Sequence, residues 1–357
     1  MDVLICKTKY SGLSYHRVEE PARAVNEAGV GVRVTVAQGL STTMSRGADS
    51  VVLDVDDQGA DVVVLQLPKT VELLQCMRIL QARGVAVVVE IDDLLSGVPF
   101  GHQGHGIVRS GLAQRAADCA READMVTVTT PALRDEYARH GRGAVVPNAI
   151  PRRLAELPPA YERTSDVVEI GWTGNVLGHP YDLQVMGSGL EQALSATAGS
   201  SRFTVLGQKF DMQQRLGLTT DPREVLWLPE VDAYIQAIGE LFDVGVAPLR
   251  IDKFNTAKSW LKVLEYSARG VYSVRSASAE YERLGLGWRA KAPKDWAKAL
   301  TKAVRDDEWR REQARAAHQV VLDQHLTEHS VPLWLGAWQR AAENRATALR
   351  RGAVAVG

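Results

Sequence analysis

The sequence has few cysteines, almost no net charge and no long hydrophobic run, and each shortage excludes a class of protein. Cys6, Cys76 and Cys119 lie far apart, without zinc-site spacing, so we expect buried thiols in a reducing compartment. The formal net charge of -1 creates no global field that would attract nucleic acid or an anionic membrane. Apolar runs such as 85–89 are too short to span a bilayer, and no signal peptide follows Met1. We therefore expect a cytoplasmic protein that does not insert into a membrane.

Two chemical signatures are weak or missing as well. No GxGxxG follows the first predicted strand at 3–6, which argues against an NAD-dependent dehydrogenase. Asp92 and Asp93 are adjacent rather than alternating, so their carboxylates would not easily face one ion. His102 and His105 lie three apart, but no further metal ligands can be assigned to them. We expect no bound metal and no cofactor.

The first half of the chain alternates apolar runs with helical patterns, which is typical of a doubly wound α/β domain. The run VAVVVEI at 85–91 is β-branched and apolar on both faces, as in a parallel strand covered by helices on either side. Further strands are predicted at 3–6, 32–36, 62–67, 125–128 and 144–146, and helices at 21–29 and 71–84.

Four prolines within 147–162 interrupt this alternation and predict a linker. Strand candidates then resume at 167–172, 203–206, 225–227, 244–247 and 271–274, and 294–351 has a helical pattern. The predicted fold class is α/β, with two Rossmann-like domains facing a cleft and a helical C-terminal tail. The boundaries we predict are 1–150 for the first domain, 151–163 for the linker, 164–328 for the second domain and 329–357 for a last helix. Ligands of open α/β sheets bind at the carboxyl ends of the strands, so the cleft is the expected site.

The segment 244–265 carries the strongest chemical signal. A strand ends near Leu249, a polar loop follows, and a helix is predicted to begin near Thr256, with backbone N–H groups suited to phosphate. Lys258 and Lys262 are four apart and would share a helix face, with Glu265 about one turn further on. A diphosphate on the loop and a ribose on Glu265 would fit this pattern. A solvated charged face on a surface helix would fit it equally well.

The segment FNTAKSWLKVLEYSARGVYSV at 254–274 resembles the donor-binding segment of retaining GT-B glycosyltransferases of glycosyltransferase family four. It is most similar to a branch with an FNxxKSxLKxxEY signature that is frequent in bacteria and their phages. Segments at 11–24, 123–131, 145–149 and 168–183 resemble other parts of the same family in the same order. The resemblance covers nearly the whole chain and implies that the last helix, at 329–357, packs back on the first domain. It implies a transferase acting in the cytoplasm, or in the host cytoplasm if a phage encodes it.

Site residues follow from this resemblance. It implies that Glu265 accepts hydrogen bonds from the ribose hydroxyls and that Lys258 neutralises phosphate charge. The donor site it predicts comprises Gly171, Thr173, Gly174, Asn175, Lys209, Phe254, Asn255, Lys258, Ser259, Lys262 and Glu265. Taken alone, the triplet at 173–175 favours an ordinary turn over a phosphate contact.

The chain departs from the family in three places. Ala257 stands where many relatives carry an acidic residue that touches the sugar, and no Arg or Lys occurs within 171–183, where many relatives have a pair. Asp92-Asp93 stands where relatives often show a His-Asp pair. We take Asp92 and His102 as the catalytic candidates, although Asp92 also suits a helix N-cap. The acceptor-side candidates are Gly12, His16, Arg17, Asp93 and His105.

The resemblance implies transfer of a hexosyl or pentosyl group, with retention, from a nucleoside-diphosphate sugar, for which a UDP-sugar is one candidate. A glycan, a protein or a modified base of phage DNA could be the acceptor. A nucleotide-sugar epimerase and a non-catalytic sugar-nucleotide-binding scaffold are the alternatives, the latter favoured by Ala257 and the missing Arg/Lys pair. No feature of the sequence indicates an oligomeric state.

Overall fold

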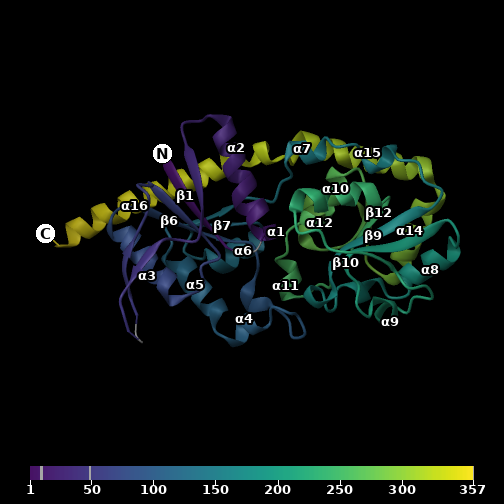
Figure 1. Ribbon diagram of the computed structural model, residues 1–357, viewed down its shortest axis with the longest axis horizontal. Helices are drawn as coiled ribbons and strands as arrows, with labels where there is room; N and C mark the ends of the chain where they lie inside the picture. Colours follow the sequence, from purple (N-terminus) through teal and green to yellow (C-terminus); the bar gives the residue numbers. More distant parts are fainter. Residues whose placement is uncertain (9–10, 48–49, 357) are drawn as a thin grey trace. The chain divides into compact units, whose positions relative to one another are not determined.

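A computed structural model of the chain describes residues 1–8, 11–47 and 50–356, which form two compact α/β units (Figure 1). The first unit contains Met1–Val98, Gly106–Asn148 and the chain from Thr327 on. The second contains Pro99–His105 and Ala149–Leu326. Each unit is built on its own parallel sheet, as the alternating sequence pattern predicted.

The sheet of the first unit has the order β2-β1-β5-β6-β7-β8, and all neighbouring strands in it are parallel. Its strands are β1 (Asp2–Lys7), β2 (Arg33–Gln38), β5 (Val62–Gln66), β6 (Ala86–Ile91), β7 (Met125–Val128) and β8 (Gly143–Val145). The main helices are α2 (Glu20–Ala28), α3 (Val71–Ala82), α5 (Leu112–Glu122), α6 (Pro131–Tyr137) and α16 (Thr327–Val356). β5 and β6 are buried along their whole length, which explains their unbroken β-branched sequences.

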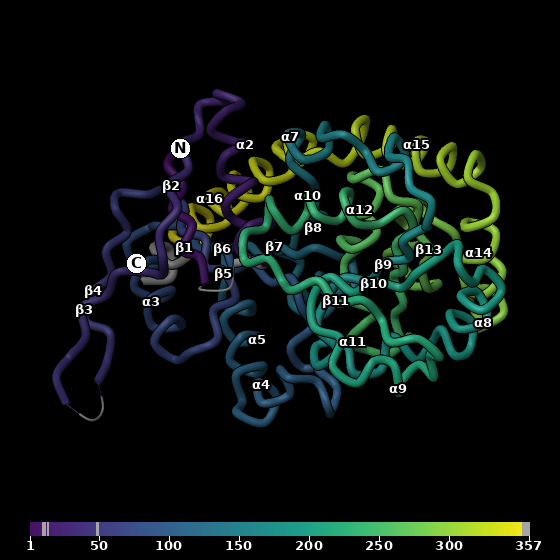
Figure 2. The backbone as a smooth tube through the Cα atoms, turned by 45° about the vertical axis from the view of Figure 1, so that its right-hand side comes forward, coloured from purple at the N-terminus to yellow at the C-terminus, as the bar shows by residue number. Residues whose placement is uncertain are grey.

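Local signals start two helices of this unit directly after the strands. The hydroxyl of Thr70 accepts a hydrogen bond from Leu73 N at the start of α3, and Thr130 does the same for Leu133 N at the start of α6. A hairpin of β3 (Thr42–Met44) and β4 (Val52–Val55) was not predicted, because these short strands are largely exposed and carry little apolar pattern. Figure 2 shows the hairpin extending away from the sheet.

The second sheet has the order β11-β10-β9-β12-β13-β14, also parallel throughout. Its strands are β9 (Val168–Asn175), β10 (Ser201–Gln208), β11 (Arg223–Val225), β12 (Val244–Ala247), β13 (Tyr272–Ser276) and β14 (Trp288–Ala290). The covering helices include α8 (Gly189–Ala196), α10 (Val231–Leu241), α12 (Leu261–Ala268), α14 (Pro293–Arg305) and α15 (Asp307–Gln324). If these six strands are numbered 1 to 6 along the chain, their order across the sheet is 3-2-1-4-5-6. This is the strand order of dinucleotide-binding sheets.

Residues 151–163, which the prolines suggested as a linker, are folded into the second unit. They contain α7 (Arg152–Ala155) and a 3-10 turn, η3 (Ala160–Glu162). The buried guanidinium of Arg269 donates to three of their carbonyl oxygens, those of Leu154, Leu157 and Pro158, at 2.8, 3.1 and 3.0 Å. These bonds satisfy backbone groups that would otherwise need water, so the segment packs as part of the unit.

Helix α16 begins at Thr327 and packs within the first unit. Trp334 and Trp338 are almost fully buried, in a cluster with Val3, Val25 and Val88. The helix lies beside α2 over one face of the sheet (Figure 1). Both α16 and α3 contact the central strand β6. Within the described residues, no helix has the length and apolar character that crossing a membrane requires.

Candidate functional site

The second sheet has one topological switch point, between β9 and β12. From β9 the chain proceeds to β10 and β11 on one side, whereas β12 and the later strands lie on the other. Ligands of such sheets bind outside the carboxyl ends of the strands at this point. β9 ends there with Thr173, Gly174 and Asn175, and β12 leads there into the segment that carries Lys258, Lys262 and Glu265. The predicted donor residues therefore converge at the switch point of the sheet.

The helix predicted from near Thr256 is in fact two helices. α11 (Lys253–Thr256) is capped by Asp252, which accepts a hydrogen bond from Asn255 N, and α12 (Leu261–Ala268) starts after Trp260. Lys258 lies in the connection, so the prediction that Lys258 and Lys262 share a helix face was wrong. The physical cause is tertiary packing of Trp260, which is buried beneath the guanidinium of Arg283 at 4.1 Å and beside the ring of His325 at 5.4 Å.

Thr173, at the end of β9, is the centre of a buried polar cluster. Lys262 Nζ donates to Thr173 O at 2.5 Å and to Thr173 Oγ1 at 3.2 Å. The hydroxyl of Tyr234, in α10, lies 3.1 Å from both Thr173 Oγ1 and Glu265 Oε2. Because a phenol has one proton and a carboxylate only accepts, Tyr234 donates to Glu265 and accepts from Thr173. The cluster thereby holds one ammonium and one carboxylate beside the same strand end.

Burial sets the protonation of this cluster. It lowers the pKa of Lys262 to about 8, although the carboxylates of Glu265 and Asp182 act in the opposite direction. The ammonium of Lys262 also lies over the Trp172 ring, 5.2 Å from its centroid. Burial, reinforced by the charge of Glu265, raises the pKa of Tyr234 well above its usual range, so this hydroxyl remains a donor.

Asp182 ties the β12–α11 loop to the segment after β9. Its Oδ1 accepts from Asn255 Nδ2 at 2.7 Å and from Arg250 N at 3.0 Å, and its Oδ2 lies 2.8 Å from His179 Nδ1. Burial alone would raise the pKa of Asp182, but these partners lower it below its ordinary value. Burial lowers the pKa of His179, against the effect of Asp182. Asp182 and Tyr234 were not predicted, because their partners lie far away in sequence.

His102 packs beside the same segment. The loop Pro99–His105 belongs to the second unit, where Tyr181 OH donates to Phe100 O at 2.8 Å and Gln103 N donates to Leu177 O at 3.0 Å. The His102 ring meets the Phe254 ring edge-on, with centroids 5.4 Å apart, and Lys258 Nζ lies 4.5 Å from the centroid of the same Phe254 ring. The structure thus brings together one predicted catalytic residue and two predicted donor residues.

Five other predicted donor residues lie in the second unit, and most of them already contact other parts of it. Gly171 lies inside β9, where an added Cβ would sit 2.1 Å from Phe242, so core packing requires this glycine and we no longer place it at the phosphates. Gly174 has φ +140° and lets β10 approach, since a Cβ on Gly207 would lie 2.0 Å from Gly174 O. Lys209 forms an ion pair with Asp221. Asn175 Oδ1 accepts from Leu177 N at 2.8 Å, and Ser259 is half-buried in the α11–α12 connection.

Asp92 and Asp93 follow β6 in the first unit. No helix starts directly after them, because the next element, the 3-10 turn η2 (Leu95–Gly97), has Leu94 at its N-cap position. The alternative of Asp92 as a helix N-cap is therefore excluded. Lys69, which follows the neighbouring strand β5, has a pKa lowered by burial and partly restored by the charge of Asp92. Lys69 was not predicted and adds a cation near the catalytic candidate.

Residues 3–150 match the family model described as a glycosyl transferase 4-like domain. No curated protein matches the chain. Among solved structures, HepE from Anabaena, in complex with UDP and glucose, is similar over 97% of this chain and 100% of its own, with 13% identity and a TM-score of 0.58. A glycosyltransferase from Rickettsia africae is similar over 96% of this chain and 99% of its own, with 10% identity and a TM-score of 0.62.

TarM from S. aureus is similar over 78% of this chain, with 12% identity and a TM-score of 0.60. The chain spans only about half of TarM, matching 55% of its length. At these identities the likeness shows the fold alone. The fold is that of the GT-B glycosyltransferases, with two Rossmann-like units and a C-terminal helix.

Within the first unit, Arg17 is buried, and hydrogen bonds fix the orientation of its side chain. Its Nε donates to Glu90 Oε1 at 2.6 Å, and its Nη1 donates to Val146 O at 2.7 Å and to Asn148 Oδ1 at 3.1 Å. Its guanidinium carbon lies 4.8 Å from the centroid of the Trp334 ring in α16. The structure thus uses Arg17 to join β6 and α16, which a sequence reading of Arg17 as an acceptor-side residue did not anticipate.

The other acceptor-side candidates are divided between the two units. Gly12 is exposed in α1 (Ser11–Ser14), whereas His16 is buried in the π-helical turn η1 (Tyr15–Glu19) against the Tyr15 ring. His105 meets the Phe100 ring at 5.7 Å in the second unit. Among the described residues no group of three or more His, Cys, Asp or Glu side chains could hold a metal ion. Asp54 and Asp56 do form an Asp-x-Asp triplet, but Asp54 pairs with Arg83.

Proposed function

We propose that the protein is a glycosyltransferase that takes a nucleoside-diphosphate sugar at the switch point of its second sheet. The observation that carries this proposal is the cluster in which Lys262 bonds directly to Thr173, while Tyr234 joins Glu265 to the same threonine. A nucleoside diphosphate offers the two complementary groups, an anionic diphosphate and a ribose with two vicinal hydroxyls. A site with one preorganised cation and one preorganised carboxylate suits both.

Each part of the donor has a proposed partner in the cluster. Glu265 accepts hydrogen bonds from the ribose, and such charged hydrogen bonds contribute roughly 1.5–3 kcal/mol each. Lys258 and Lys262 face the diphosphate. Trp227 supplies a surface for the base, because its ring is half-exposed and lies 4.9 Å from the Tyr234 ring at an interplanar angle of 32°. From the sequence, Trp227 was predicted only as the last residue of a strand at 225–227 and not as a ligand contact.

Chemistry at this site consists of stabilising the departing diphosphate. Two ammonium groups positioned before the reaction neutralise the charge that develops as the bond to the sugar breaks. On this account the lysines do the work of a metal ion, and we propose that transfer is metal-independent. The resemblance to family four supports transfer of a hexosyl or pentosyl group with retention. We assign sugar and acceptor contacts to Asp92 and His102, with a glycan, a protein or a modified DNA base as the acceptor.

A screen of nucleoside-diphosphate sugars by thermal unfolding tests the proposal. A donor present at 100 times its Kd should raise the free energy of unfolding by about 2.7 kcal/mol, which a melting curve resolves. The stabilising donor is then incubated with the protein in excess chelator, and the anomeric configuration of the released or transferred sugar is read by proton NMR. Release or transfer with retained configuration is expected. Isomerisation of the donor without transfer, or activity that returns only on adding manganese or magnesium, would contradict the proposal.

A further inference from the structure

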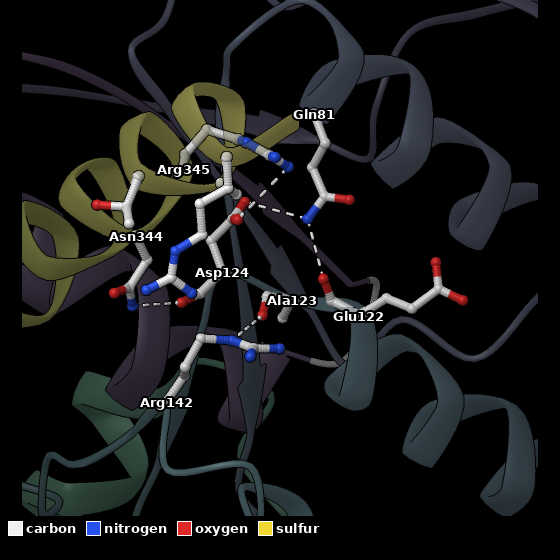
Figure 3. A pocket seen from close by; sticks show the side chains of 10 residues that line it. Gln81, Glu122, Ala123, Asp124, Arg142, Asn344 and Arg345 are labelled. Carbon is white, nitrogen blue, oxygen red and sulfur yellow. Dashed lines mark hydrogen bonds and ion pairs between the residues drawn. The ribbon is translucent and has the colours of Figure 1, made fainter. Parts of the chain in front are cut away.

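A polar cavity of about 560 Å³ lies in the first unit, at the edge of the sheet where β7 and β8 begin. The carboxyl ends of the strands, with Asp92, are at the opposite edge. The ends of α3 and α5 form one wall, and the C-terminal part of α16 forms the other (Figure 3). Six polar residues determine its chemistry: Gln81, Glu122, Asp124, Arg142, Arg345 and Arg351.

Both carboxylates of the cavity are already occupied. Asp124 Oδ2 accepts from Val87 N at 2.9 Å and from Gln81 Nε2 at 3.1 Å, and its Oδ1 lies 3.6 Å from Arg345 Nη1. Glu122 accepts two hydrogen bonds from Arg78, at 2.8 and 2.6 Å. Each carboxylate therefore already has an arginine partner, and neither of them pairs with Arg142.

The guanidinium groups of the cavity, in contrast, have N–H donors left that a ligand could bond. Arg142 donates to Ala123 O and Arg121 O, both at 3.0 Å, and among the described residues it pairs with no carboxylate. Arg345 is mostly buried, and its Nε has no hydrogen-bond partner. Arg351 is exposed at the mouth. An unpaired donor of this kind is costly unless a ligand or water satisfies it.

The carboxyl ends of α3 and α5 also lie at the cavity and oppose this positive charge. Each helix end corresponds to about half a negative charge, so together they offset about one arginine. The three lining arginines and Arg78 carry four positive charges, against the two negative charges of Glu122 and Asp124. This excess of positive charge is larger than the offset from the helix ends. The field in the cavity therefore stays positive and favours an anion.

We propose that this cavity binds a small phosphate monoester, clamping α16 onto α3 and α5. Its volume lies within the roughly 300–1,000 Å³ of small-molecule sites. The planar guanidinium fork matches phosphate oxygens in pairs, and a phosphate monoester is the compact anion that makes most use of several forks. Asn344, whose Nδ2 donates to Asp124 O at 2.9 Å, already fixes this part of α16 to the sheet. The site is independent of the proposed donor site and uses none of its residues.

Calorimetric titration of the full chain with glycerol 3-phosphate tests this. The Lys258→Ala variant serves as the background, because it removes a cation of the donor site that could bind phosphate on its own. Saturable binding is expected in the wild type and in this background alike. Arg351→Gln, at an exposed position, and Arg142→Gln should each weaken binding about tenfold, which is the loss of one charged hydrogen bond. Arg139→Gln is the matched control, since Arg139 is exposed and pairs with Glu136 outside the cavity.

Co-sedimentation with phosphatidylcholine vesicles, with and without phosphatidic acid, distinguishes a free metabolite from a lipid headgroup. Binding of glycerol 3-phosphate without vesicle binding supports a free metabolite. Vesicle binding that needs both phosphatidic acid and Arg351 supports the same phosphate site with a lipid as its ligand. The proposal is overturned if neither probe binds, if binding disappears in Lys258→Ala, or if Arg351→Gln and Arg142→Gln bind like Arg139→Gln.

Discussion

Lys262 links the protonation of the proposed donor site to its affinity. Its pKa of about 8 lies below the ordinary lysine value because of burial, so the ammonium loses its charge in a range that is easily measured. Affinity for a nucleoside diphosphate should fall as the pH rises through about 8. Lys262→Arg keeps its charge far above this range and should bind with little change between pH 7 and 9. Calorimetric titrations across this range check the prediction, and identical pH profiles for both proteins would contradict it.

Stability should respond to pH in the opposite direction. The pKa of Lys262 is lowered in the folded state, so between about 8 and 10.5 the unfolded chain binds more protons. The contribution of Lys262 to the free energy of unfolding therefore rises with pH in this window, while donor affinity falls. A loss of affinity caused by general unfolding would not show this divergence.

Asp92 should act on turnover rather than on donor binding. Because Asp92 caps no helix, Asp92→Asn removes no capping hydrogen bond. If Asp92 contacts sugar or acceptor in the transition state, kcat and kcat/KM should fall together, by about tenfold or more, while donor Kd stays constant. Steady-state kinetics and a donor titration measure this, with Asp118→Asn as a control at a partly exposed position in α5. Unchanged kinetics would remove Asp92 from the mechanism.

The sequence predicted the charged residues of the site but not the groups that orient them. Lys258, Lys262 and Glu265 lie within one short segment, so their spacing and the family resemblance could indicate them together. Tyr234 and Asp182 lie 31 and 73 residues from Glu265 and Asn255, their partners in the cluster. Hydrogen bonds between such distant positions leave no periodic pattern in the sequence.

At the scale of elements, every strand of the two parallel sheets except β14 was predicted and two of them to the residue, whereas the connections were not. Predicted strands at 125–128 and 244–247 coincide with β7 and β12, because fully buried strands carry continuous apolar runs. The break between α11 and α12 and the packing of Pro99–His105 on the second unit depend on tertiary contacts of Trp260, Phe254 and Tyr181. Local propensity cannot anticipate contacts of this kind.

β9 should be intolerant of any side chain at Gly171. Its Cβ would lie 2.1 Å from the buried Phe242, so Gly171→Ala forces the core apart and should cost about 1–3 kcal/mol of unfolding free energy, or prevent folding. Gly336→Ala, inside α16, is the matched control. Its Cβ meets nothing nearer than Arg340 Nη1 at 3.7 Å, so better helix propensity should stabilise the protein by roughly 0.5–1 kcal/mol. Urea unfolding measures both. Similar stability of Gly171→Ala and the wild type would contradict the packing account.

At the scale of the whole molecule, the chain leaves the first unit, builds the second and returns with α16. The return is marked in sequence by Trp334 and Trp338, four residues apart, whose rings pack 6.0 Å from each other in the core of the first unit. The two Rossmann-like units themselves were predictable from the apolar runs of their strands. The assignment of the donor to the second unit depends instead on the strand order, which places the switch point beside Glu265.

The most direct test of the donor site compares how two variants bind a nucleoside and its diphosphate. Calorimetric titrations would use wild type, Glu265→Gln, Lys258→Ala and, as a control, Glu240→Gln, an exposed position in α10. Glu265→Gln should weaken both ligands about ten- to a hundredfold, because both contain the ribose. Lys258→Ala should weaken the diphosphate strongly and the nucleoside little, and Glu240→Gln should match the wild type. Wild-type affinity for both ligands in Glu265→Gln and Lys258→Ala would show that the donor does not bind at this switch point.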